Sequence, residues 1–196
     1  MPDEPIDRIL DAAYASFTRH GIRRTTMDDI AAAAGMSRPA VYQYVKNKDD
    51  VFLRLANRLF GAALVQATAA AMSEGPLATR LQQVLGAKLE LTLRLVRESP
   101  HAAELLDESA RLSGGAVEEF TGQVRELLAD TITSAADRGE ITLADAKPTE
   151  VAEIIMALTH GLELDLADAD GMRRRLALGL ELLVGGLSRR RTTGAP

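Results

Sequence analysis

The sequence has no cysteine and no tryptophan, and only three of its 196 residues are histidine. The absence of cysteine excludes disulfides, thiolate metal sites and cysteine nucleophiles. Aromatic residues amount to 4% of the chain, which disfavours β-sandwiches and grooves in which aromatic rings stack on sugars or bases. Nucleophile motifs and phosphate-binding glycine loops are also missing. These absences predict a protein that is not an enzyme and needs no cofactor.

Long apolar runs are missing as well, so no segment approaches the roughly 20 residues that cross a bilayer. The first residues, MPDEPIDRIL, are acidic and lack the basic and then apolar pattern of a signal peptide. With 46% hydrophobic and 26% charged residues, the composition is that of an ordinary globular protein. We therefore expect a soluble, cytoplasmic protein.

Charge is distributed unevenly along the chain. The net charge is −5, yet residues 19–48 contain six Lys or Arg and only two Asp, a local balance of +4. Residues 51–196 contain 16 basic and 20 acidic residues. A short basic segment joined to an acidic body indicates a phosphate-binding element. The alternative is that the same basic residues only solvate a helical surface.

Prolines stand where helical patterns begin, because a residue in the first turn of a helix has no intrahelical N–H bond to lose. These prolines are Pro5, Pro39, Pro76, Pro100 and Pro148. Apolar residues with a 3.6-residue period predict an all-α fold of about nine helices. The expected ranges are 6–17, 26–34, 37–45, 51–72, 76–98, 100–111, 115–138, 148–165 and 169–187.

Residues 22–48 carry the chemistry of the basic segment. Two short predicted helices are separated by Gly35-Met36-Ser37, and Thr26 and Ser37 are suited to cap them. The first helix would pack Ile30, Ala31 and Ala34 inward, and the second Ala40, Val41 and either Tyr44 or Val45. This is a helix-turn-helix arrangement, in which the second helix lies in the major groove of DNA.

The outward residues of the second helix suit that role. They are Arg38, Pro39, Tyr42 and Gln43. Arginine pairs with guanine, glutamine pairs with adenine, and a tyrosine hydroxyl reaches a phosphate oxygen. The partner predicted from these residue types is double-stranded DNA.

The segments TTMDDIA (25–31) and AGMSRPAVYQYVKNKDDVF (34–52) resemble the signature of the TetR family of transcriptional regulators. The resemblance covers about residues 6–53, a quarter of the chain. It implies that Thr26 and Lys48 hold phosphates and that Arg38, Pro39 and Gln43 face bases. Val45 departs from the family pattern, in which an aromatic residue is commoner.

The full set of DNA-binding residues expected from pattern and resemblance has nine members. They are Thr26, Ser37, Arg38, Pro39, Tyr42, Gln43, Tyr44, Lys46 and Lys48. Structural alternatives remain for four of them. Thr26 and Ser37 could act only as helix caps, Tyr44 could lie in the core, and Lys46 could be a solvated surface charge.

The remainder of the chain is expected to form a second domain. The predicted division is residues 1–50 for the three-helix DNA-binding module and residues 51–196 for ligand binding and dimerisation. The resemblance places a homodimer interface on the last two helices, so that two modules can bind a palindromic operator. Its apolar stripes are Val151, Ile154, Ile155, Leu158, Leu162, Leu176, Leu180, Leu183, Val184 and Leu187. Burial of these stripes within one subunit is the alternative.

The resemblance also implies a pocket for a small-molecule effector, whose binding would release DNA from a repressor. The candidate lining is Phe60, Leu64, Leu91, Leu95, His101, Leu105, Phe120, Val124, Met156 and His160. It is mostly aliphatic, which favours an apolar effector, although a plain aliphatic core would have the same composition. His160 is expected to lie in the core or in the pocket.

Other readings of the sequence remain. A regulator of the same fold could respond to a protein or to nothing, and a non-DNA helical adaptor would also have many amphipathic helices. Glu98 and His101 have the spacing of a helical metal motif, but Pro100 interrupts it and no second copy exists. We therefore predict no metal site. The arginine clusters at 173–175 and 189–191 are read as solvated charges.

Overall fold

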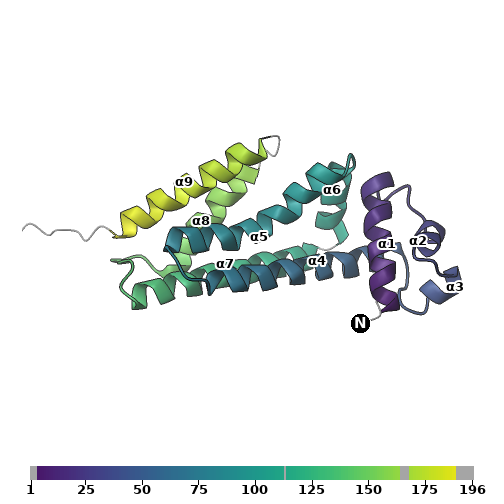
Figure 1. The fold of residues 1–196 in the computed structure, drawn as a ribbon, viewed down its shortest axis with the longest axis horizontal. Coiled ribbons are helices and arrows are strands. Elements are labelled where there is room, and N and C mark those ends of the chain that lie inside the picture. Colours follow the sequence, from purple (N-terminus) through teal and green to yellow (C-terminus); the bar gives the residue numbers. More distant parts are fainter. Residues whose placement is uncertain (1–3, 113, 164–167, 189–196) are drawn as a thin grey trace, which may run out of the picture. The chain divides into compact units, whose positions relative to one another are not determined.

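The computed structural model describes residues 4–112, 114–163 and 168–188. These residues form nine α-helices and no strand, which confirms the all-α prediction (Figure 1). In chain order the helices are α1 (Pro5–His20), α2 (Met27–Ala33), α3 (Arg38–Val41), α4 (Lys48–Ala71), α5 (Leu77–Glu98), α6 (Ala102–Leu112), α7 (Gly114–Asp137), α8 (Pro148–Glu163) and α9 (Ala169–Ser188). Among the described helices none is both long and apolar enough to span a membrane.

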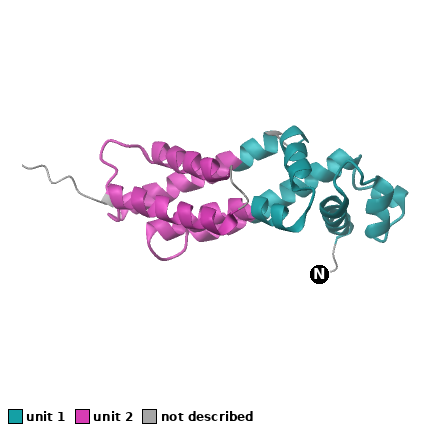
Figure 2. Ribbon diagram, turned by 90° about the horizontal axis from the view of Figure 1, so that it is seen from above, with its two compact units in different colours: residues 1–62, 91–120 teal, residues 63–90, 121–196 magenta. Residues whose placement is uncertain are grey.

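The chain separates into two compact units (Figure 2). The N-terminal unit comprises Met1–Ala62 and Leu91–Phe120, and the C-terminal unit comprises Ala63–Glu90 and Thr121–Pro196. Helices α4, α5 and α7 contribute residues to both units. The N-terminal unit therefore holds the predicted helix-turn-helix together with α6 and the end of α5. The proposed domain boundary at residue 50 stays a prediction.

Apolar side chains of α1 form the centre of the N-terminal unit. Ile9, Ala13 and Phe17 recur at helical spacing and are at most 1% exposed. The ring of Phe17 lies 5.9 Å from that of Phe52. Buried residues of the other helices complete the cluster, namely Ile30, Val41, Val45, Val51, Leu55 and Leu105. Burial of each large aliphatic side chain contributes about 1.5–3 kcal/mol, so this core holds α2 and α6 against α1, and α3 packs on α2.

The C-terminal unit has its own aliphatic core. Its largest fully buried side chains come from α5, α7, α8 and α9, and they are Leu81, Leu85, Leu128, Ile132, Ile155, Met172, Leu176 and Leu180. Helices α8 and α9 pack directly on each other. A Cβ atom at Gly179 would lie 2.7 Å from Leu158, so glycine permits the close approach of this helix pair.

The third predicted helix ends earlier than expected. Helix α3 ends at Val41, not near Val45, because the next turn tightens. The N–H groups of Gln43 and Tyr44 bond three residues back, to the carbonyls of Ala40 at 3.2 Å and Val41 at 3.0 Å. The chain thus continues as a tighter turn that still buries Val45. Helix α8 is described as far as Glu163, and the predicted end at residue 165 lies outside the described residues.

Candidate nucleic-acid interface

Thr26 begins α2 through a reciprocal capping box. Its side-chain oxygen accepts a hydrogen bond from the Asp29 N–H at 3.2 Å, and the Asp29 carboxylate accepts from the Thr26 N–H at 2.8 Å. The Thr26 hydroxyl also donates to that carboxylate at 2.7 Å, and these bonds hold the pKa of Asp29 below its usual value. The predicted cap is confirmed, and Thr26 remains exposed at the start of the helix.

The turn between α2 and α3 uses the predicted residues. Gly35 has φ +66°, a backbone conformation that glycine adopts without a Cβ penalty. The Ser37 Oγ accepts a hydrogen bond from the Ala40 N–H at 3.4 Å, which confirms this residue as the N-cap of α3. Val41 and Val45 are buried, whereas Tyr44 is 38% exposed. Val45 therefore takes the inward place, and Tyr44 is left on the surface.

The outward face of α3 and of the turn that follows it is polar and exposed. Arg38, Pro39, Tyr42 and Gln43 all lie on the surface. The Arg38 guanidinium is 2.9 Å from the Asp28 carboxylate, 3.4 Å from the Tyr42 hydroxyl and 5.6 Å from the centre of the Tyr42 ring. The Tyr42 hydrogen bond and the Asp28 charge raise the pKa of Arg38. The sequence did not reveal this use of Asp28.

Lys48 lies at the first residue of α4, where the helix dipole disfavours a cation. Its ammonium group donates to the backbone carbonyls of Ile22 at 2.7 Å and Thr25 at 2.9 Å, and is 3.5 Å from that of Arg23. Three carbonyl oxygens match the three N–H donors of an ammonium group. Lys48 thus ties the start of α4 to the loop between α1 and α2. Its expected contact with a phosphate stays a prediction.

Capping residues also fix the segment that leads into α4. The Asn47 side chain accepts a hydrogen bond from the Asp50 N–H at 2.8 Å. The Asp50 carboxylate in turn accepts from the backbone N–H of Lys46 at 2.8 Å and pairs with Arg54 at 3.0 Å. The Lys46 side chain is left exposed. Its expected DNA contact therefore rests on its charge and position alone.

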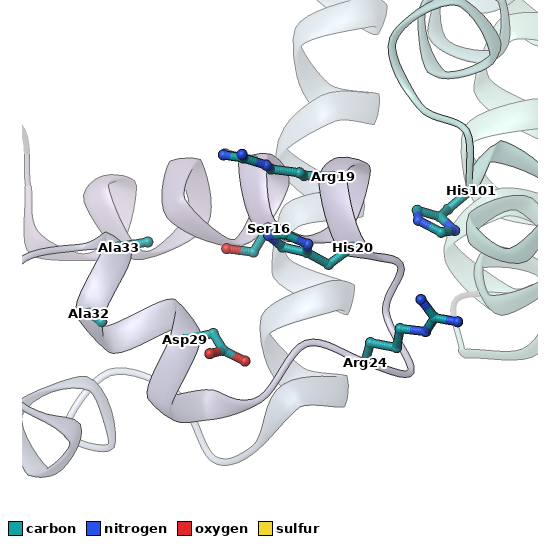
Figure 3. A pocket seen from close by; sticks show the side chains of 9 residues that line it. Ser16, Arg19, His20, Arg24, Asp29, Ala32, Ala33 and His101 are labelled. Carbon is teal, nitrogen blue, oxygen red and sulfur yellow. The ribbon is translucent and has the colours of Figure 1, made fainter.

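A hollow of about 610 Å³ lies in the N-terminal unit between α1 and α2. Its ionisable lining residues are Arg19, His20, Arg24, Asp29 and His101. Arg24 and His101 approach each other, whereas Arg19 points away from both (Figure 3). The cationic groups do not converge on a single point, so the geometry assigns no ligand to this hollow.

The residues expected to line an effector pocket are divided between the two units. Six of them lie in the N-terminal unit and four in the C-terminal unit. Phe60 and Phe120 stack with their ring centres 4.9 Å apart, and Leu105 belongs to the core around α1. The His160 side chain is 80% exposed, so the expected core or pocket position of this histidine is wrong. The remaining expected lining residues are Leu64, Leu91, Leu95, His101, Val124 and Met156, and of these Val124 is fully buried.

The expected dimer residues also separate into two groups. Val151, Ile155, Leu176 and Leu180 are at most 6% exposed within their own unit. Their side chains therefore already pack within the protomer, as the alternative for these stripes proposed. The half-buried members of the set are Leu158, Leu162, Leu183, Val184 and Leu187. Ile154, the remaining member of the set, is 55% exposed, and on α9 two apolar residues outside the set are also exposed, Leu178 at 57% and Leu182 at 69%.

The geometry of the N-terminal unit defines a class of protein. Two capped helices joined by a glycine turn are held by a buried apolar core, and the second helix and the turn after it present arginine, tyrosine and glutamine to solvent. This is the architecture of a helix-turn-helix DNA-binding module. Residues 9–55 match the family model described as bacterial regulatory proteins, tetR family. The protein is a transcriptional regulator of the TetR family, and regulators of this family bind DNA.

Known relatives extend the similarity beyond the module. The HTH-type transcriptional regulator YhgD of Bacillus subtilis (strain 168) is 28% identical over 137 residues, which cover 68% of this chain and 70% of YhgD. A crystal structure of a transcriptional regulator from Cytophaga hutchinsonii superposes with a TM-score of 0.79 at 18% identity, covering 95% of this chain and 100% of that one.

SmeT is the repressor of the Stenotrophomonas maltophilia multidrug efflux pump SmeDEF. It superposes with a TM-score of 0.66 at 21% identity, covering 97% of this chain and 94% of SmeT. SmeT has also been determined as a triclosan complex, with a TM-score of 0.65. At these identities the solved structures establish the shared fold and not a shared ligand.

Proposed function

We propose that this regulator is a homodimeric repressor that binds a palindromic operator and is released from it by a small apolar effector. DNA binding is supported by one observation: polar side chains of α3 and of the turn after it are exposed, while buried apolar side chains beneath them hold this segment in place. Val41 and Val45 are buried in the core of the N-terminal unit. Arg38, Tyr42 and Gln43 are exposed to solvent. A rigid support of this kind is needed for side chains that read base edges.

The homodimer is supported by the exposed face of α8 and α9. On α8, Ile154, Leu158 and Gly161 are separated by four and three residues, so they share one side of the helix. On α9, Leu178, Leu182 and Gly185 repeat the same spacing. Nothing lies within 4 Å of a Cβ atom placed at Gly161 or Gly185. Two apolar stripes that end in open glycines suit the close approach of the same pair of helices from a second copy.

A second copy is also what the DNA-binding module requires. A single module reads only one half-site, and two-fold operators place their half-sites about 34–36 Å apart. A C2 dimer supplies two modules related by the same symmetry as a palindrome. We therefore propose Ile154, Leu178 and Leu182 as the centre of the interface.

An apolar effector is supported by the aliphatic interior and by the triclosan complex of SmeT. In this chain the ring pair of Phe60 and Phe120 is the main aromatic surface among the expected lining residues. Any effector that releases DNA must bind the DNA-free conformation more tightly than the DNA-bound one. An effector that bound both conformations equally would leave the repressor on its operator.

Selection of bound fragments from random DNA duplexes tests the partner and the symmetry together. We expect enrichment of a two-fold symmetric sequence whose half-sites are about one helical turn apart. Enrichment of an asymmetric half-site would contradict the dimeric mode of binding. A protein that enriched nothing and showed no salt-dependent affinity for duplex DNA would instead be a helical adaptor.

Thermal unfolding with triclosan and with medium-chain fatty acids tests the effector. A ligand specific for the folded state raises the unfolding temperature as its concentration exceeds its Kd. We expect at least one of these apolar probes to stabilise the protein and to lower its affinity for the selected duplex. Operator binding that no probe changes would favour a regulator of the same fold without a small-molecule ligand.

A further inference from the structure

The loop between α1 and α2 is held from two directions by side chains that are distant in sequence. Lys48, at the start of α4, donates to the carbonyls of Ile22 and Thr25. Glu104, in the first turn of α6, accepts a hydrogen bond from the backbone N–H of Arg23 at 2.8 Å. Two carbonyl groups of the loop are thus bonded to α4, and one of its N–H groups is bonded to α6.

Gly21 makes room for the Glu104 carboxylate. Its φ of +79° favours glycine, and a Cβ atom at this position would lie 2.6 Å from a carboxylate oxygen of Glu104. Residues 21–23 therefore supply the N–H donor of Arg23 and, at Gly21, the space that the Glu104 carboxylate occupies. Two independent features of the loop are matched to the single carboxylate of Glu104.

The loop leads directly into Thr26, the cap of α2. Displacement of residues 21–25 would move Thr26 and with it the N-terminus of α2, which is expected to face a DNA phosphate. We propose that Glu104 is a positioning residue for DNA binding, which acts by holding the α1–α2 loop through the Arg23 N–H. This inference rests on the proposed DNA-binding function of the module.

The charge of Glu104 cannot explain such a role, because a carboxylate near the basic segment would repel DNA. The side chain of Arg23 lies 3.9 Å from a different carboxylate, that of Glu108, with which Arg111 also pairs at 2.7 Å. The contribution of Glu104 is therefore its acceptor oxygen and not its charge. A substitution that keeps an acceptor oxygen but removes the negative charge distinguishes a hydrogen-bonding role of Glu104 from an electrostatic one.

The test measures affinity for the selected duplex as a function of salt for three variants. Glu104→Ala removes acceptor and charge, Glu104→Gln keeps an acceptor oxygen without charge, and Asp107→Ala removes an exposed carboxylate from the same helix. We expect Glu104→Ala to bind about tenfold more weakly, on the scale of one ordinary hydrogen bond. The other two should bind within about twofold of the parent protein. All should keep the parent salt slope, since none contacts a phosphate.

Hydrogen exchange supplies a local readout that a general loss of stability would not reproduce. The Arg23 amide should exchange faster in Glu104→Ala than in Glu104→Gln, with α5 and α9 amides unchanged. Gly21→Ala should also weaken DNA binding by displacing the carboxylate, and its effect should be smaller in the Glu104→Ala background.

The outcomes separate this inference from the proposed function. A parent protein that binds no duplex would overturn the proposed function itself. A parent that binds, with Glu104→Ala equal to it or tighter, would overturn the role of Glu104 alone. Equal weakening by Glu104→Ala and Asp107→Ala would assign the effect to a general disturbance of α6 and would likewise reject a positioning role.

Discussion

At the scale of single residues, the proposed base-reading group is already engaged in the free protein. The Arg38 guanidinium pairs with Asp28 and lies against Tyr42. Both partners of the ion pair are more than half exposed, and exposed pairs of this kind contribute only about 0–1 kcal/mol. Breaking the Arg38–Asp28 ion pair when Arg38 binds DNA therefore costs little free energy. The pair orients Arg38 without blocking it.

Arg38→Ala should relax base preference at one position of each half-site. A bidentate arginine–guanine contact discriminates by about 1–3 kcal/mol. The measurement is binding to the selected duplex and to its single-base variants. Asp28→Asn is the matched control, because it keeps the guanidinium and should preserve the preference. An Arg38→Ala protein with unaltered preference at every position would remove Arg38 from the reading face.

The raised pKa of Tyr14 predicts that the stability of the protein falls at alkaline pH. Its hydroxyl donates to Glu98 at 2.7 Å, and burial together with this hydrogen bond raises the pKa of Tyr14 to about 12. The unfolded chain loses this proton near pH 10, so the folded state binds more protons between pH 10 and pH 12. The stabilisation is complete below pH 10 and is lost as the pH rises to about 12.

Urea unfolding of the parent protein and Tyr14→Phe from pH 9 to pH 12 checks this sign. The parent should be the more stable at pH 9, and the difference should shrink as the pH rises. Tyr44→Phe alters an exposed tyrosine and should leave the pH profile unchanged. A difference between parent and Tyr14→Phe that grew with pH would contradict the assigned direction.

At the scale of secondary-structure elements, α2 depends on its cap because it has only seven residues. Thr26→Ala removes the side-chain half of the capping box, which typically costs about 0.5–2 kcal/mol. We expect a loss of about 1 kcal/mol in the free energy of unfolding, measured by urea titration. Thr26→Ser keeps the hydroxyl and should stay close to the parent. Equal stability of the alanine and parent proteins would show that the tertiary core alone holds α2.

Lys48 joins two elements, which changes what its substitution should do. Lys48→Met keeps the aliphatic stem but leaves the loop carbonyls without their ammonium donor. We expect weaker binding to all duplexes alike, together with a loss of about 1–3 kcal/mol in the free energy of unfolding for the unpaired polar groups. Lys46→Met is the control, since the Lys46 side chain is exposed. Unaltered stability in Lys48→Met would indicate that the lysine serves DNA alone.

At the scale of the whole molecule, the exposed apolar face of α8 and α9 should decide the oligomeric state. Leu182→Glu places a charge at a side chain that is 69% exposed in the protomer. The fold should therefore persist, as seen by circular dichroism, while sedimentation should show dissociation to monomers. Affinity for the palindromic duplex should fall by at least tenfold because two linked modules become independent.

Val65→Glu is the matched control for this change. Val65 is 71% exposed on α4, so the substitution adds the same charge outside the proposed interface. It should leave both the oligomeric state and the DNA affinity unchanged. A Leu182→Glu protein that remained a dimer with parent affinity would place the interface elsewhere.

Much of the N-terminal unit could be predicted from local sequence because its signals lie within a few residues of one another. Thr26 and Asp29 form a capping box at a separation of three residues, and Ser37 caps α3 by accepting from the Ala40 N–H at the same separation. The end of α3 was less predictable, because the energies of α-helical and tighter turns differ little at a helix terminus. Burial of Val45 in place of Tyr44 was one of two predicted alternatives.

The C-terminal unit was less predictable because its helices are apolar on more than one side. On α9 the pattern favoured Leu176 and Leu180 as interface residues, yet these side chains fill the unit's own core. Leu178 and Leu182 lie on the other face and stay exposed. His160 was expected inside because its helix is apolar, but it falls on the solvent side. Helical periodicity shows which residues share a face of a helix. It does not show whether that face packs within the protomer, against a second copy or against solvent.

The sequence by itself determined the helices, their caps and the basic segment, since these depend on backbone preferences and on contacts between near neighbours. Only the tertiary structure decided which distant groups meet. Lys48 reaches carbonyls more than 20 residues earlier, and Glu104 binds an N–H that is 81 residues away in the chain. Such pairings depend on how the buried faces of several helices pack together, and no local pattern encodes that packing.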